Sequence, residues 1–229
     1  MASVIIHLAI AKKVKEKLKL KENKDYYLGA IAPDISKQIG EDKEQSHFLI
    51  NTKKNIPNLS LFIKRYPFFS NNPFQLGYFI HLFTDKLWYE EFLPQYRRND
   101  FIKLQDGTSI NVDKDGLQDI IYSDYSNLNI QIIDEYHLDL SLFYEEFTLP
   151  KTTFLEIPIE KLDILLNKTG IIIENSKEEK KYTFHFRLFQ IFFYLCAVLK
   201  EVTEWNRFQN DCPLSLRRRR WLCRRKVTN

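Results

Sequence analysis

The sequence predicts an all-α protein, a multi-helical bundle with at most one small β-hairpin. Several stretches repeat apolar residues at helical spacing, most clearly residues 3–20 and 73–92. Glycine and proline are few, 6 and 8 of 229 residues, which disfavours a sandwich or barrel built from many tight turns. A hydrophobic content of 44% suffices to bury one substantial core.

The first half of the chain predicts four apolar helical segments. Ser3 is a suitable N-cap for the first, and Asn72-Pro73 provides a cap and a first-turn proline for the last. The second segment should stop at Ala32, because a residue that precedes proline disfavours the helical region. Asp34 would then lie in a turn directly after a buried segment. The four predicted segments are residues 3–20, 26–32, 58–66 and 73–92.

The second half predicts shorter helices after one β-turn. Asp106-Gly107 is typical of a hairpin turn between short apolar runs. The sequence Asn167–Gly170 is a plausible helix C-cap. The helices expected here cover residues 115–123, 126–137, 139–147, 158–167 and 180–206.

The net charge of +4 comes from one end of the chain. Residues 213–229 hold six arginines and Lys226 without an acid, so the remainder carries −3. We therefore predict one helical domain over 1–206 and a basic tail over 207–229, which we interpret as disordered or aberrant. Nucleic acid is a possible partner only through this tail. No apolar run is long enough to span a membrane and no signal peptide is evident, so a cytoplasmic location is expected.

Five imidazole and carboxylate residues lie on or beside apolar segments. His81 and Asp85 are four positions apart in the apolar stretch 77–85, so they share one face of a helix. Buried polar groups are costly without a partner, and a divalent cation suits both residue types. Taken singly, each residue has an ordinary explanation as a cap or a core side chain. The full set is His7, Asp34, His47, His81 and Asp85.

In order and local context these residues resemble the zinc-dependent phospholipase C family, whose fold is shared with the S1/P1 nucleases. The resemblance covers roughly residues 4–92 and rests on the segments Ile6–Ala9, Leu28–Asp34, Ser46–Phe48 and Leu76–Asp85. It implies an all-helical fold with zinc ions in a cleft and hydrolysis of phosphate esters. It also implies that His7 holds a further ion, beside central ions held by Asp34, His47, His81 and Asp85.

The chain departs from that family in two respects. Known members use the amine of a processed N-terminus as a ligand, which the lack of a signal peptide makes unexpected here. They also have a later histidine and glutamate, whereas no histidine lies between His81 and His137. Glu91 and Asp124 are the candidates to replace these ligands. We therefore expect one to three zinc ions, with two the most favoured number.

The expected chemistry is metal-assisted hydrolysis. Zinc lowers the pKa of bound water to about 7, and two ions can clamp a phosphate. Asp34 would orient or deprotonate that water. Tyr78 and Trp88 would line the cleft and stack on the substrate, although aromatic residues at helical spacing are more often core.

Two other functions remain open. An HD-type phosphohydrolase also uses histidine and aspartate on helices, but the chain lacks the adjacent His-Asp pair of that family. A catalytically degenerate relative would keep a structural metal, or none, and act as a binding protein. His137 and His185 lie outside the pattern and are interpreted as ordinary histidines.

Overall fold

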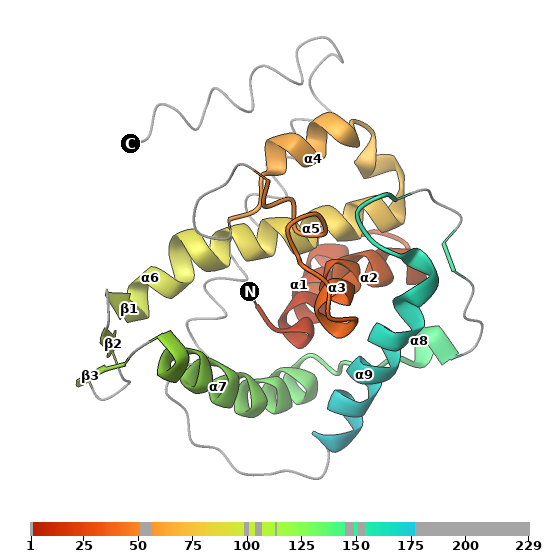
Figure 1. Cartoon of the computed structure of the whole chain (residues 1–229). Helices are drawn as coiled ribbons and strands as arrows, with labels where there is room; N and C mark the ends of the chain where they lie inside the picture. Colours follow the sequence, from red (N-terminus) through yellow and green to blue (C-terminus); the bar gives the residue numbers. More distant parts are fainter. Residues whose placement is uncertain are drawn as a thin grey trace.

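A computed structural model describes residues 2–50, 56–98, 101–103, 107–112, 114–144, 149–150 and 154–176. This part is mostly helical, as predicted (Figure 1). The predicted helix 180–206, the tail, His185 and the three cysteines lie outside it. The α-helices are α1 (Val4–Leu18), α2 (Lys24–Ile31), α3 (Ile35–Gln38), α4 (Leu59–Arg65), α5 (Pro73–Leu87), α6 (Leu93–Tyr96), α7 (Lys114–Glu135), α8 (Ser141–Tyr144) and α9 (Leu162–Asn175).

Short 3₁₀ and π turns and a small sheet complete the described part. The 3₁₀ turns are η1 (Ala32–Asp34), η2 (Phe69–Asn71) and η4 (Ile159–Lys161), and the π-helical turn is η3 (Trp88–Phe92). The expected hairpin is present within an antiparallel sheet of three strands, in the order β1 (Arg97–Arg98), β2 (Phe101–Lys103) and β3 (Ser109–Asn111). No helix in the described ranges is both long and apolar enough to cross a membrane.

Side-chain caps fix where the helices begin. Ser3 accepts a hydrogen bond from the Ile6 N–H at the start of α1, and Asn72 accepts one from Gln75 at the start of α5. Both caps were predicted. Asn58 caps α4 in the same way. These caps place the first residues of α1 and the whole of α5 where the sequence pattern puts them.

The helices α2 and α5 cross with their backbones in contact. A Cβ on Gly29 would lie 2.0 Å from the Phe74 carbonyl oxygen, and a Cβ on Gly77 would lie 1.9 Å from that of Tyr26. Only glycine permits this approach, since neither backbone can yield without separating the helices. The crossing carries the end of α2 to the middle of α5, and α1 packs against both helices (Figure 1).

Two predicted helix boundaries were wrong, and a third was right for a different reason. The helix α2 ends at Ile31 with Ala32 as its C-cap, as predicted, but Ala32 keeps helical backbone angles and Pro33 tightens the chain into η1. One helix, α7, replaces the two predicted over 115–123 and 126–137, because Tyr125, in the expected break, is buried. Gly170 does not end α9, which continues until Ile173 is also packed in the core.

Candidate metal centre

The structure brings all five predicted residues together in the interior. His7 comes from α1, Asp34 from η1, His47 from the turn before α4, and His81 and Asp85 from α5. Asp34 is 6% exposed and the other four are 1% exposed or less. Four separate segments therefore deliver three imidazoles and two carboxylates to one buried point.

His81 has one ring nitrogen available for a ligand. Its Nδ1 lies 2.8 Å from the Ala30 carbonyl oxygen, which only accepts, so Nδ1 carries the proton. The bare Nε2 faces Asp85 Oδ2 at 3.7 Å. The carbonyl of Ala30 is exposed to the ring because α2 ends there. This outer contact fixes the ring orientation in the manner common for metal-binding histidines.

His47 is held at the end of a single helical turn. The Leu49 N–H donates to the Glu44 carbonyl and the Phe48 N–H donates to the Gln45 carbonyl, which together form a Schellman motif. Phe48 occupies the left-handed position, with φ 53°, where glycine is usual. Its buried ring packs against aromatic neighbours, which offsets the backbone cost. The turn therefore stops immediately after His47 and fixes its direction.

Ser46 also supports His47. Its hydroxyl oxygen lies 2.9 Å from His47 Nδ1 and 3.3 Å from the Lys43 carbonyl oxygen. The Tyr78 hydroxyl donates to the Ser46 carbonyl. Ser46 and Ala30 were not predicted as supporting groups from the sequence. The only signal available was the position of Ser46 beside His47 in the resemblance.

Four ligand atoms lie close together around His47. His47 Nε2 lies 3.3 Å from His81 Nε2, and 3.7 Å from both Asp34 Oδ1 and Asp85 Oδ2. Metal bonds of 2.0–2.1 Å at a tetrahedral angle would place ligand atoms about 3.3–3.4 Å apart. His47, His81 and Asp85, whose three mutual distances are 3.3–3.7 Å, come near this spacing and form a group that can hold one ion.

His7 lies against this group, and its ring has no hydrogen bond within the described residues. Its ring stacks on His81 with centroids 3.6 Å apart, and Nε2 lies 3.5 Å from Asp85 Oδ1. Both ring nitrogens of His7 and Asp85 Oδ2 are buried without a hydrogen-bond partner in the described part of the chain. Unsatisfied buried groups of this kind indicate an ion or a water that belongs at the site. The backbone N–H of Ala2 donates to Asp85 Oδ1 at 3.0 Å, so the start of the chain also reaches the centre.

The protonation states suit cation binding. Burial lowers the pKa of His81 to about 3, and neighbouring His7 acts in the same direction. Burial raises the pKa of Asp34, but the adjacent His47, His81 and His7 outweigh this and bring the pKa to about 2. The pKa of Asp85 is also held well below its usual range, since His7 and His81 overcome the effect of burial. At neutral pH the site thus presents two carboxylates and a neutral imidazole.

Two overlapping groups of ligand atoms can hold a metal ion. One contains His7, Asp34 and His81, and the other contains His47, His81 and Asp85. His81 belongs to both, but it offers only Nε2. In this arrangement the two groups share one ion or compete for it. If His81 ligates the first ion, the predicted second ion would have to be held by His7 and by Asp85, with the Asp85 carboxylate bridging the two ions.

Of the remaining predicted site residues, those with described side chains lie outside the cluster. Glu91 is exposed on η3. Asp124 is in α7, but its side chain lies outside the described set. Tyr78 and Trp88 are 0% and 2% exposed, and Trp88 stacks on Phe92. The rings of Tyr78 and Trp88 are therefore core residues in this structure and are not available to stack on a substrate.

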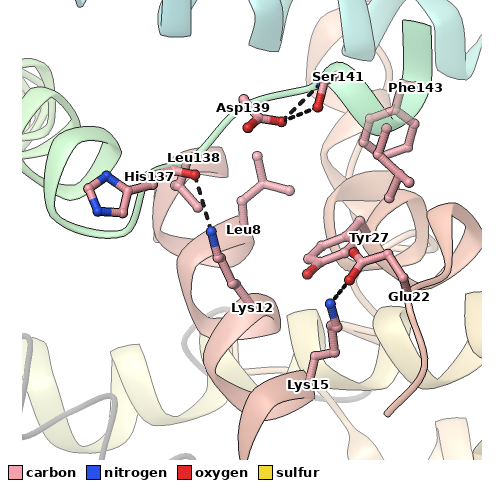
Figure 2. A pocket seen from close by; sticks show the side chains of 11 residues that line it. Leu8, Lys12, Lys15, Glu22, Tyr27, His137, Leu138, Asp139, Ser141 and Phe143 are labelled. Atoms are coloured by element: carbon pink, nitrogen blue, oxygen red, sulfur yellow. Dashed lines mark hydrogen bonds and ion pairs between the residues drawn. The ribbon is translucent and has the colours of Figure 1, made fainter. Parts of the chain in front are cut away.

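A separate pocket of about 340 Å³ is lined by other residues of α1, among them Leu8 and Lys12 (Figure 2). Leu8 lines it, whereas His7 faces the metal centre. Lys15 pairs with Glu22, and Lys12 donates to the His137 carbonyl oxygen at 3.1 Å. These charged groups are already paired within the pocket wall. Their charges therefore give no indication of which class of ligand the pocket would bind.

No family model, curated protein or solved structure matches this chain. The candidate centre therefore depends on its own geometry and on the sequence resemblance.

Proposed function

We propose that the chain is a metal-dependent hydrolase of phosphate esters, with zinc as its ion. The observation that carries the proposal is the close spacing of three buried ligand atoms, on His47, His81 and Asp85, with Asp34 Oδ1 3.7 Å from His47 Nε2. Mixed nitrogen and oxygen ligands of this kind suit zinc, or iron or manganese. The resemblance to the zinc-dependent phospholipase C family supports phosphate esters as the substrate class.

Asp34, His47, His81 and Asp85 would hold one ion, which would take a water as a fifth ligand for hydrolysis. When bound, zinc supplies a Lewis acid and lowers the pKa of a bound water to about 7. The Asp34 side chain is 9% exposed, against 1% for those of His47 and Asp85. The route to solvent therefore passes Asp34, whose carboxylate can orient a water or accept its proton.

A second candidate function is a binding protein with a structural metal. The burial of all five residues favours it, because a substrate needs an open position at a catalytic ion. The later histidine and glutamate of the family also have no counterpart among the described residues of the cluster. This alternative predicts metal uptake without hydrolysis.

Hydrolysis assays on purified protein separate the two functions. We would supply zinc and offer phosphodiesters, phosphomonoesters and phospholipids to the wild type, to Asp34→Asn and to His81→Ala. The proposal expects hydrolysis of at least one class, with both variants reduced to background. Glu156→Gln, which alters a buried carboxylate elsewhere, is the matched control and should stay active. Zinc bound by the wild type without hydrolysis would support the structural role, and activity surviving in His81→Ala would exclude this site.

A further inference from the structure

We propose that His47 carries its ring proton on Nε2 in the metal-free protein, and that the Ser46 hydroxyl allows the ring to change to the Nδ1–H tautomer that metal binding requires. Ser46 is thus a positioning residue that acts through His47. The inference rests on the proposed metal centre and concerns how that centre is loaded.

The tautomer of His81 is fixed. Its Nδ1 proton is held by the Ala30 carbonyl oxygen at 2.8 Å, so a neutral ring has only a lone pair on Nε2. That lone pair points toward His47. His81 therefore accepts from His47 and cannot donate to it.

The approach of the two rings then determines the proton on His47. The two Nε2 atoms are 3.3 Å apart in a buried site. Two bare nitrogens would face each other with their lone pairs, which is unfavourable away from water. A proton on His47 Nε2 makes the same contact a hydrogen bond. The nearest carboxylate oxygens, on Asp34 and Asp85, are 3.7 Å away and too far to replace it.

Ser46 provides a partner for either tautomer. Its hydroxyl has one proton and two lone pairs, and it lies between His47 Nδ1 at 2.9 Å and the Lys43 carbonyl oxygen at 3.3 Å. With the ring proton on Nε2, the hydroxyl donates to Nδ1. With the ring proton on Nδ1, the hydroxyl accepts from the ring and donates to Lys43. The Ser46 hydroxyl and His47 Nδ1 therefore have hydrogen-bond partners in both tautomeric states.

The exchange leaves the charge of His47 unchanged. The Nε2 proton departs to solvent as the metal takes that lone pair, and a proton from solvent is gained at Nδ1. Only the Ser46 O–H bond rotates. Ser46 is fully buried, at 0% exposed. Removing the hydroxyl leaves Nδ1 without this partner in both states, and the loaded state loses more, because an acceptor for Nδ1–H also orients the ligating ring and raises the basicity of Nε2.

Nitrogen NMR of ¹⁵N-histidine-labelled protein tests the tautomers directly. Spectra at pH 7.5 would be recorded before and after one equivalent of zinc, with His47→Gln used to assign the signals. We expect His47 to change from Nε2–H to Nδ1–H while His81 keeps Nδ1–H throughout. A metal-free His47 that already has Nδ1–H, or has both nitrogens protonated, would overturn the inference.

Zinc affinity of Ser46→Ala tests the role of the hydroxyl. Loss of an outer partner of a ligating histidine typically costs 10–100-fold in affinity, and we expect a loss in that range. Thr169→Val is the control, since it removes another buried hydroxyl, one that donates to a backbone carbonyl in α9. Unchanged affinity in Ser46→Ala would overturn the inference. Failure of the wild type to bind zinc would instead contradict the proposed function, because the metal-free tautomer is measured independently.

Discussion

Two buried clusters in this molecule contain carboxylates, and they satisfy them differently. Glu156 is 6% exposed, and both of its oxygens are held by protein donors, Arg65 and the Tyr66 hydroxyl. Asp85 is 0% exposed and receives one backbone N–H, from Ala2, while its other oxygen has no hydrogen bond among the described residues. The first cluster contains its own cation, whereas the second contains imidazoles that are good metal ligands.

The two clusters differ in whether a positive charge balances their carboxylates. Burying an ion is expensive unless it is paired, and the guanidinium of Arg65 provides that pairing for Glu156. Around Asp34 and Asp85 no lysine or arginine forms an ion pair in the described part of the chain. A divalent cation would supply the missing positive charge and would also satisfy the bare nitrogens. The comparison therefore separates a structural ion pair from a binding site.

The largest expected effect comes from the helix crossing that brings Ala30 to His81. Gly77→Ala would place a methyl group 1.9 Å from a backbone oxygen, so α2 and α5 must separate and Ala30 must leave His81. We expect a loss of more than about 4 kcal/mol in the free energy of unfolding, or failure to fold. Urea denaturation measures this. Gly40→Ala is the control: it has open space but φ 74°, and should cost only about 1 kcal/mol. Equal losses would contradict the close crossing.

Removal of metal should be next in size. Zinc at a thousand times its dissociation constant would stabilise the folded protein by about 4 kcal/mol. For a domain of this size, that corresponds to a decrease in Tm of about 8–16 °C on chelation. Calorimetry with and without a chelator gives the value. Glu156→Gln should show the same shift from a lower starting Tm. Absence of a shift in the wild type would argue against a metal centre.

Asp85→Asn should weaken zinc binding by more than about 100-fold, because it removes a charged ligand and not merely an outer partner. The amide oxygen can still accept from the Ala2 N–H, so the fold should survive. Titration calorimetry of the folded variant measures the affinity. Glu156→Gln is the paired control and should bind as the wild type does. Normal zinc binding by Asp85→Asn together with weakened binding by Glu156→Gln would mean that the two clusters have been assigned the wrong roles.

The metal-free protein should lose stability in acid. His81 has its ordinary pKa of 6.5 in the unfolded chain but a pKa of about 3 when folded. The unfolded state therefore binds more protons between these values, and stability falls as the pH drops below 6.5. This amounts to about 2 kcal/mol at pH 5. Asp34, lowered from 3.8 to about 2, adds a further loss below pH 4. Denaturation midpoints in a chelator between pH 7 and pH 5 measure the loss. Constant midpoints would be inconsistent with a neutral buried ring.

The smallest effect is expected at the ion pair itself. Glu156→Gln keeps the shape of the side chain but removes its charge, and the Arg65 side chain is 42% exposed and can turn to water. We expect a loss of about 1 kcal/mol in the free energy of unfolding, with metal content unchanged. Denaturant titration and elemental analysis of the same preparation check both. Reduced metal content in this variant would blur the distinction between the clusters.

Local signals in the sequence predicted much of this arrangement. Ser3 and Asn72-Pro73 gave correct helix starts, because capping depends on residues only a few positions apart. The five candidate ligands could be selected because each is a polar residue on an apolar segment. Their convergence is a fact of the structure, whereas zinc binding and the roles of the individual residues stay predictions.

Other features depend on contacts between distant segments. Gly170 carries no mark that distinguishes a helix end from a helix interior, and the packing of Ile173 extends α9 past it. The rings of Tyr78 and Trp88 could be core or cleft at the same spacing, and only their burial distinguishes the two. Ser46 supports His47 through a turn whose left-handed residue is a phenylalanine, which the usual glycine signal misses.

The most direct test is a crystal structure of zinc-loaded protein, with anomalous scattering recorded at the zinc edge. The account predicts an anomalous peak within about 2.0–2.2 Å of His47 Nε2, His81 Nε2 and carboxylate oxygens of Asp34 and Asp85. Zinc bound only at other residues, or these side chains joined to each other with no ion between them, would contradict it.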